Sequence, residues 1–172
     1  GEHVRDACTK RQLDFSVMVD GEPLDNKQKV SQRVFVEADL DALESIVFQF
    51  LSNALKFTPE GGLIELAVEQ SEDRVRLVVR DNGPGIRASK EEQLRSVLSG
   101  DAQSLSLEDS ATQLGLSICH VLADKMHGVL DLQSTPGKGS AFWLDLPILD
   151  TERPLLNLLM VDDDPQMLVL LE

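Results

Sequence analysis

The hydrophobic period of the chain changes near residue 40, and this change constrains the fold more than any other feature. Residues 40–58 repeat apolar side chains at three- and four-residue steps, as an amphipathic helix does, and Asp39 suits its N-cap. The stretches 63–70 and 74–81 then alternate apolar and polar residues, as strands with one buried face do. Pro59 and the glycines after it separate helix from strand. The order predicts a helix followed by two adjacent strands.

Further elements are predicted on both sides of this unit. Strands are expected at 13–20 and 33–39, with a loop at 21–28 between them. A polar stretch, 87–112, holds a short helix and a loose tail, and loops of this length are usually lids or disordered segments. The short helix is predicted at 89–98. A second helix follows, with Gly128 near its end and one apolar face made of Leu114, Ile118, Leu122 and Met126. After it we expect hairpin strands at 129–134 and 140–147, a strand at 155–161 and the start of a helix at 165–172.

Composition excludes some functions and partners. The chain has 172 residues, of which 42% are hydrophobic, so a core is affordable. Its net charge of -14 argues against nucleic-acid binding, although a local pocket can still accept phosphate. Cys8 and Cys119 lack metal or redox spacing, which fits a reducing cytosol. No apolar run approaches the roughly 18 residues of a membrane span. Because the chain lacks an initial Met, we interpret it as a piece of a longer protein, which is cytoplasmic or membrane-anchored.

LSNALKFTPEGG, residues 51–62, places polar side chains inside an otherwise apolar helix. Gln49, Asn53 and Lys56 are spaced i, i+4 and i+7, so they share one stripe beside the apolar face. An amide oxygen is a hard ligand suited to magnesium, and the Lys56 ammonium can neutralise phosphate. Because polar stripes are the rule on amphipathic helices, these residues alone favour a solvated stripe.

DNGPGI, residues 81–86, has two interpretations. Asn-Gly and Pro-Gly pairs form turns, which favours a hairpin. The flanks argue against it, because a strand leads in and a charged helical segment leads out. A carboxylate at a strand end can accept a hydrogen bond from an exocyclic amine, and glycines let a flat ring approach the backbone.

Two further stretches carry weaker signals. In TQLGLSIC, residues 112–119, a glycine at a helix start would let backbone N–H groups face an anion, although an ordinary helix entry explains it equally. TPGKGSAFWLDLP, residues 135–147, is a glycine-rich hairpin that a purely structural role explains.

In order, these four stretches resemble the catalytic and ATP-binding domain of sensor histidine kinases, within the GHKL ATPase superfamily that includes type II topoisomerases and a heat-shock chaperone. LSNALKFTPEGG resembles its asparagine box, DNGPGI its first glycine box, LGLSIC the later part of its second, and GKGSAFWLDLP its closing hairpin. The resemblance covers about residues 1–149. It implies a Bergerat-type α/β two-layer sandwich, in which helices cover one face of a mixed sheet.

The resemblance also implies a ligand and roles for single residues. ATP with Mg2+ would bind between the helix and a lid. Asn53 would ligate the magnesium, Lys56 would touch phosphate, and Asp81 would bind the adenine amino group. The residues implied through their backbone are Gly83 and Gly85, which would shape the base pocket, and Leu114, Gly115 and Leu116, which would border the phosphates. No residue is implied to be catalytic, because transfer would depend on positioning and charge neutralisation.

Residues 155–172 carry a second resemblance, to the first strand and helix of a response-regulator receiver domain. Asp164 before Pro165 suits an N-cap and first helical residue, which leaves Asp162 and Asp163 to match the receiver's acidic magnesium pair. The predicted organisation lists the end of an upstream helix (1–12), the catalytic domain (13–149), a linker (150–154) and a truncated receiver (155–172), cut from a hybrid kinase.

The sequence departs from the family pattern in the lid. The first asparagine of the family is Gln49 here, and two glycines of the second glycine box are Ala111 and Gln113. RSVLSGDAQ stands where a Phe-x-Pro-Phe pattern is expected. None of the three histidines has the context of the phosphoacceptor; these are His3, His120 and His127.

Three functions remain open from the sequence. The chain is the ATP-binding part of a hybrid histidine kinase, a degenerate kinase domain that regulates by docking or sensing ATP, or another ATPase of the superfamily. The motif residues favour the first, the divergent lid favours the second, and the receiver-like tail disfavours the third. Expected partners are ATP or ADP, the dimerisation and histidine-phosphotransfer domain of the parent protein, and a receiver domain or response regulator.

Overall fold

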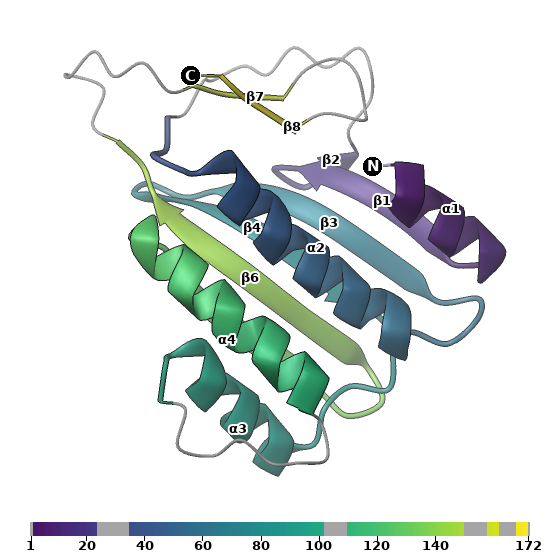
Figure 1. Ribbon diagram of the computed structural model, residues 1–172. Coiled ribbons are helices and arrows are strands. Elements are labelled where there is room, and N and C mark those ends of the chain that lie inside the picture. Colours follow the sequence, from purple (N-terminus) through teal and green to yellow (C-terminus); the bar gives the residue numbers. More distant parts are fainter. Residues whose placement is uncertain (1, 24–34, 102–109, 150–157, 162–167, 172) are drawn as a thin grey trace.

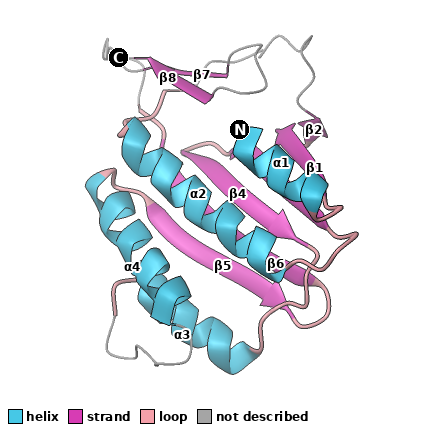
Figure 2. Cartoon of the chain, turned by 45° about the vertical axis from the view of Figure 1, so that its right-hand side comes forward, coloured by secondary structure: helices cyan, strands magenta, loops and turns pink. Residues whose placement is uncertain are grey.

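The structure, a computed structural model, describes residues 2–23, 35–101, 110–149, 158–161 and 168–171. Helices lie together on one face of a six-stranded sheet (Figures 1 and 2). The helices are α1 (Glu2–Lys10), α2 (Leu40–Phe57), α3 (Ala88–Leu98) and α4 (Ser110–Lys125). The strands are β1 (Asp14–Val19), β2 (Glu22–Pro23), β3 (Leu63–Gln70), β4 (Arg74–Asp81), β5 (Val129–Thr135), β6 (Gly139–Pro147), β7 (Leu158–Val161) and β8 (Leu168–Leu171).

The sheet is mixed, with the strand order β2-β1-β3-β4-β6-β5. β1 pairs in parallel with β3, and the other neighbouring strands pair antiparallel. A parallel pair needs a long crossover, and α2 lies within the chain between β1 and β3. The predicted α/β two-layer sandwich with a mixed sheet is confirmed.

The core lies between the helices and the sheet, and its two sides come from the two predicted periods. On β4 the alternate residues Val75, Leu77 and Val79 face the core, as the period of a half-buried strand requires. The helices contribute residues at helical spacing, and the largest fully buried side chains include Phe50, Leu43, Ile46, Leu116, Ile64, Leu132 and Leu144.

The other face of the sheet carries charged pairs. Arg76 donates to both oxygens of Asp145, at 2.7 and 2.8 Å, and lies over the ring of Trp143 at 4.5 Å. Arg80 donates to Glu65 and Glu69 across the neighbouring strand. This polar face explains how one layer of helices suffices for the sheet.

The helix ends follow the predicted capping signals. Asp39 accepts the N–H of Ala42 at 3.0 Å, so the predicted N-cap of α2 is confirmed. After α4, the N–H of Gly128 donates to Ala123 at 2.9 Å while His127 takes a positive φ of 53°. This pattern places His127 at the left-handed position, one residue before the glycine that was predicted near the helix end. A Cβ on Gly128 would lie 2.7 Å from a methyl group of Leu144, so the glycine is needed for packing.

Three predicted elements differ in the structure. Instead of a strand at 33–39, the described part holds one bridge, between Val36 and Ile148, because the chain turns at once to cap α2. The predicted loop 21–28 contains the short strand β2, and residues 24–28 lie outside the described residues. The loose tail is also shorter than predicted, since α4 begins at Ser110.

The helix predicted for 165–172 is wrong at residues 168–171, which form β8 and pair antiparallel with β7. A short apolar run such as LVLL fits either structure by its pattern. Pairing with β7 satisfies backbone groups that one turn of helix would leave free. Residues 162–167, with the three consecutive aspartates, and the linker 150–154 lie outside the described residues.

Candidate functional site

A cavity of about 460 Å³ opens between α2, α3 and the sheet. It receives residues from four parts of the chain that are far apart in sequence. Three of the predicted site residues, Asn53, Asp81 and Gly85, line it together. Its other lining residues are Ala54, Phe57, Pro84, Ile86, Arg87, Ser89, Lys90, Gln93, Leu94, Thr112, Ser140 and Phe142.

Asn53 is a buried polar residue on the face of α2 that borders the cavity. Its side chain is 6% exposed, and its oxygen accepts a hydrogen bond from Gln49 Nε2 at 3.3 Å. Its amide nitrogen has no partner among the described residues. A buried amide group without a partner costs free energy, so this side chain is suited to a polar ligand in the cavity. The solvated stripe favoured by the isolated pattern is therefore wrong at Asn53.

Lys56 lies at the rim and not in the lining. Its ammonium group is 3.5 Å from the hydroxyl of Thr112, which does line the cavity, and 4.9 Å from the ring centre of Phe57. The side chain is exposed, so it can reach a charged group that extends out of the cavity.

Asp81 ends β4 and presents a carboxylate to the cavity. Burial raises the pKa of Asp81, while hydrogen bonds from the backbone N–H groups of Gly83 and Ser140 oppose that rise. The Gly83 bond measures 2.8 Å. These bonds orient the carboxylate and leave it able to accept from a donor inside the cavity.

The loop after β4 packs tightly, and two glycines allow it. A Cβ on Gly83 would lie 2.7 Å from the Asp81 carboxylate and 3.3 Å from the backbone oxygen of Phe57. Gly85 has a positive φ of 68°, and a Cβ there would clash with the backbone oxygen of Thr135. The hairpin alternative for DNGPGI is wrong, because the loop leads into α3 and Gly85 forms part of the cavity wall.

Leu114, Gly115 and Leu116 of α4, which the resemblance places beside the phosphates, do not line the cavity. Because α4 begins at Ser110, Gly115 lies in its second turn, where backbone N–H groups bond within the helix. The prediction that this glycine stands at the helix start is therefore wrong. Leu116 is buried in the core, Leu114 is 60% exposed, and a Cβ on Gly115 would clash with the end of Gln49.

Sequence reasoning missed the apolar and polar residues that complete the cavity. Its apolar walls include Ile86, Leu94 and Phe142, which a pattern assigns to the core like any other apolar residue. Ser140 lies opposite Asp81 in the strand register, which no local motif encodes. Arg87 and Lys90 follow the loop directly, so their position after the first glycine box was the available signal.

The cavity lies within a stretch of the chain that matches a known protein family. Residues 38–150 match the model of the family described as histidine kinase-, DNA gyrase B-, and HSP90-like ATPase. The chain belongs to this ATPase family. The match includes Asn53, Asp81 and the loop and hairpin that surround the cavity.

Related proteins are sensor kinases. The adaptive-response sensory kinase SasA of Synechococcus sp. (strain JA-3-3Ab) is 34% identical over 66% of this chain and 30% of its own length. The sensor histidine kinase TmoS of Ectopseudomonas mendocina is 32% identical over 77% of this chain and 14% of its own. The sensor protein EvgS of Escherichia coli (strain K12) is 30% identical over 82% of this chain and 13% of its own length. The chain thus spans less than a third of the length of these relatives.

Solved structures share the fold. The catalytic domain of histidine kinase ThkA superposes with a TM-score of 0.62 at 23% identity, covering 85% of this chain and 90% of that domain. Full-length ShkA, solved in complex with AMPPNP, gives a TM-score of 0.68 at 24% identity over 90% of this chain and 30% of that one. The family is therefore that of the histidine kinase-, DNA gyrase B-, and HSP90-like ATPases, and the fold is the one seen in histidine kinase catalytic domains.

No group of three or more His, Cys, Asp or Glu side chains among the described residues could hold a metal ion. None of the helices within the described ranges combines the length and apolar character needed to cross a bilayer. Both cysteines are free and buried.

Proposed function

We propose that this domain binds Mg-ATP in the cavity and presents its γ-phosphoryl group to a histidine of a dimerisation domain outside this chain. In that transfer a histidine nitrogen bonds to the γ-phosphorus as the bond to the bridging oxygen breaks, and ADP leaves. The observation that supports the proposal most is the convergence of a buried amide, Asn53, and a partly buried carboxylate, Asp81, on one cavity.

Asp81 would select adenine. Its carboxylate lies at the strand end, held by the Gly83 N–H, and can accept a hydrogen bond from the exocyclic amine of adenine. Guanine presents a carbonyl oxygen at that position, which a carboxylate repels. Gly83 and Gly85 keep the loop close to the strand, and Ile86, Leu94 and Phe142 would contact the faces of the base.

Asn53 would hold magnesium together with the phosphates. Its oxygen retains a lone pair beside the bond from Gln49, so it fits a metal that takes few protein ligands. Its unpartnered nitrogen is a donor and would suit a phosphate oxygen beside that metal. When bound, Mg2+ would supply neutralisation of phosphate charge. Lys56 would add a positive charge from the rim, and Arg87 and Lys90 line the same cavity.

The backbone of Leu114, Gly115 and Leu116 would border the phosphates only if the first turns of α4 rearranged. In the structure these three residues lie within the helix, where their N–H groups bond to the preceding turn. Gln113, which directly precedes them, is fully buried. The role stays a proposal, supported by Thr112, which lies in the same helix and lines the cavity.

We further infer that the parent protein is a cytoplasmic or membrane-anchored hybrid kinase that pairs this domain with a receiver domain. This inference depends on the DDDP sequence near residue 162, in a segment that resembles a receiver. The second candidate is a degenerate kinase domain that binds nucleotide and regulates a partner kinase. The buried Gln113, in place of a family glycine, favours that candidate.

Calorimetry with Mg-ATP tests the proposal on the wild-type domain and on Asp81→Asn. The wild type should bind ATP and discriminate against GTP, whereas Asp81→Asn should lose about 10- to 100-fold in ATP affinity, since a bond to a charged acceptor contributes roughly 1.5–3 kcal/mol.

Asp145→Asn is the matched control, because Asp145 lies on the charged face of the sheet and pairs with Arg76. It should leave ATP affinity unchanged. If the wild-type domain gave no heat of binding with Mg-ATP, the proposal that it binds nucleotide would be wrong. Binding without transfer to a histidine-bearing dimerisation domain added in trans would favour the degenerate kinase domain.

A further inference from the structure

We propose that Arg95 is a positioning residue, which fixes α3, one wall of the cavity, to the edge strand β5 and thereby sets the affinity of the cavity for its ligand. The proposal rests on the proposed function, because it gives that site a supporting element. Arg95 does not line the cavity, so it would act through the helix that carries it.

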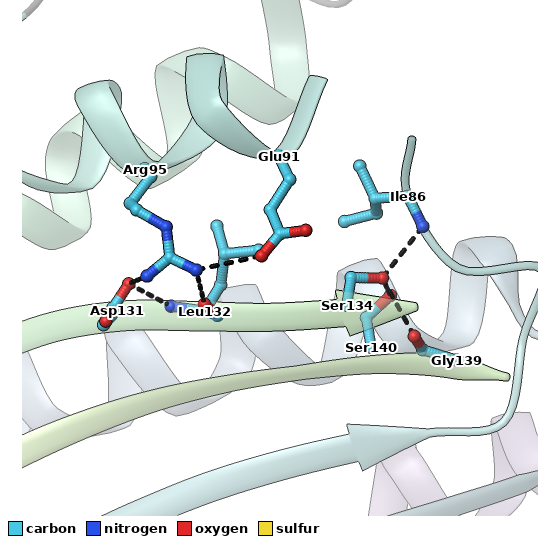
Figure 3. A network of polar contacts seen from close by, with 8 residues as sticks. All are labelled: Ile86, Glu91, Arg95, Asp131, Leu132, Ser134, Gly139 and Ser140. Carbon is cyan, nitrogen blue, oxygen red and sulfur yellow. Dashed lines mark hydrogen bonds and ion pairs between the residues drawn. The ribbon is translucent and has the colours of Figure 1, made fainter. Parts of the chain in front are cut away.

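The guanidinium group of Arg95 reaches three acceptors on two elements (Figure 3). Nη2 donates to Glu91 Oε1 at 2.9 Å, one turn earlier in α3, and to the backbone oxygen of Leu132 at 2.5 Å. Nη1 pairs with the carboxylate of Asp131. That carboxylate also accepts the N–H of Leu132 at 2.8 Å, so both backbone groups of Leu132 find side-chain partners at the edge of the sheet.

A second group of contacts ties the start of the same wall to the same hairpin. The N–H of Ile86 donates to Ser134 Oγ at 2.8 Å. That hydroxyl donates to the backbone oxygen of Gly139 at 2.9 Å and lies 3.1 Å from the hydroxyl of Ser140 (Figure 3). The segment that begins at Ile86 is therefore held at both ends by β5 and the first residues of β6.

The residues held between these two anchors form the wall. Those that line the cavity are Ile86, Arg87, Ser89, Lys90, Gln93 and Leu94. The same hairpin supplies Ser140, which lines the cavity beside Asp81. Asp81 and α3 are therefore both attached to the β5–β6 hairpin. Loss of the Arg95 contacts would let α3 move relative to Asp81 on the other side of the cavity.

The chemistry of the contact suits positioning better than stability. An exposed ion pair contributes little to the free energy of unfolding, and the Arg95 side chain is 44% exposed. A planar guanidinium that bridges two carboxylates and a carbonyl, however, fixes direction as well as distance. The buried residues of α3, which are Leu94, Val97 and Leu98, would keep the helix on the core without Arg95.

The test compares Arg95→Ala with Arg76→Ala. Arg76 makes an equivalent two-bond pair with Asp145, but on the charged face of the sheet. Calorimetry should show Arg95→Ala weakening Mg-ATP binding about 5- to 20-fold, which is less than the roughly 10- to 100-fold expected for a direct charge-assisted contact because Arg95 acts only through α3. Arg76→Ala should stay within about twofold of wild type. Arg95→Lys should fall between, because an ammonium group cannot bridge three fixed acceptors at once. Equal affinity in Arg95→Ala and wild type, or equal loss in the two alanine variants, would overturn the proposal.

Hydrogen exchange of the ligand-free proteins separates this proposal from the proposed function. Amides of α3 should exchange faster in Arg95→Ala than in wild type, while α4 amides stay unchanged. Unchanged α3 exchange in a domain that binds Mg-ATP would overturn the positioning role alone. A wild type that binds no Mg-ATP would overturn the proposed function, and the affinity role of Arg95 with it.

Discussion

The two ends of the cavity are built by different means. At the strand end, Asp81 is held by backbone N–H groups and by a loop that Gly83 and Gly85 keep close to the sheet. At the helix end, Asn53 is held by the side chain of Gln49, and the neighbouring helix α4 presents side chains where the family motif has glycines.

This difference affects how far each end can be preorganised. The two backbone donors at the strand end lie two residues after Asp81 (Gly83) and opposite it in the sheet register (Ser140), so they orient the carboxylate before a ligand arrives. The amide contact at the helix end joins two rotatable side chains at 3.3 Å, and the Asn53 nitrogen has no partner within the described ranges. We therefore expect base recognition to be rigid and phosphate recognition to depend on the ligand and its metal.

The strongest test of the rigid end is Gly85→Ala. The residue has a positive φ of 68°, and its Cβ would clash with the backbone of Thr135, so the variant should lose about 3 kcal/mol or more in the free energy of unfolding. Gly137→Ala is the matched control, since its φ of 78° is equally unfavourable but its Cβ would meet open space, and it should lose only about 1–2 kcal/mol. Urea titrations measure both. Equal losses would show that φ alone, and not close packing of the loop, requires Gly85.

The strand end was also the part that sequence predicted best. A turn of glycines after a strand is local, so DNGPGI fixed the place of Asp81 and of Gly85 without knowledge of distant residues. The period of α2 and the capping role of Asp39 are local in the same way, and both are confirmed. Ser140, in contrast, reaches Asp81 through strand pairing across 59 positions of sequence, and no motif records that register.

The prediction that Gly115 stands at a helix start was wrong because it depended on where α4 begins, whereas Asn53 at the same end of the cavity does line it. TQLGLSIC has the same apolar spacing whether α4 starts before or at Gly115, so the pattern could not separate these cases. The structure starts the helix at Ser110, which places Leu116 in the core and Gln113 among the buried residues. Likewise, the apolar run at 168–171 fits strand or helix, and its partner β7 decided the outcome.

Asn53→Ala tests whether the adaptable end needs a metal. The variant should lose about tenfold of the gain in ATP affinity that magnesium provides, which corresponds to one ligand contact of about 1.4 kcal/mol. Without ligand it should be as stable as wild type or slightly more stable, because it removes a buried nitrogen that lacks a partner.

Ser52→Ala, an exposed neighbour on α2, is the control for Asn53→Ala and should change neither quantity. Calorimetry with and without magnesium, together with thermal unfolding, provides the measurements. If affinities with and without magnesium fell by the same factor, Asn53 would contact the nucleotide and not the metal.

The pH dependence of stability tests the partly buried carboxylate of Asp81 and should show a smaller effect. Burial raises the pKa of Asp81 in the folded state above its value in the unfolded chain. Between these two pKa values the folded state binds more protons, so the contribution of Asp81 to stability falls as pH rises through that window. Asp81→Asn removes this titration. As pH rises through the window, the free energy of unfolding of Asp81→Asn should therefore increase relative to wild type, by about 1.4 kcal/mol per unit of separation between the two pKa values. Above the window the difference should stay constant. A difference that did not change with pH would show that Asp81 titrates normally.

Leu114→Ala should have the smallest effect, and it tests the helix end from its outer side. The leucine is 60% exposed and alanine favours helices at least as well, so unfolding free energy should change by less than about 0.5 kcal/mol. Leu116→Ala, two residues later and fully buried, should by contrast lose about 2–5 kcal/mol. Because only its backbone is assigned to the phosphates, Leu114→Ala should also keep ATP affinity within about twofold, less than the tenfold step of one contact. A larger loss of ATP affinity with unchanged stability would show that its side chain packs against the bound nucleotide, and hence that the first turns of α4 move when the cavity is filled.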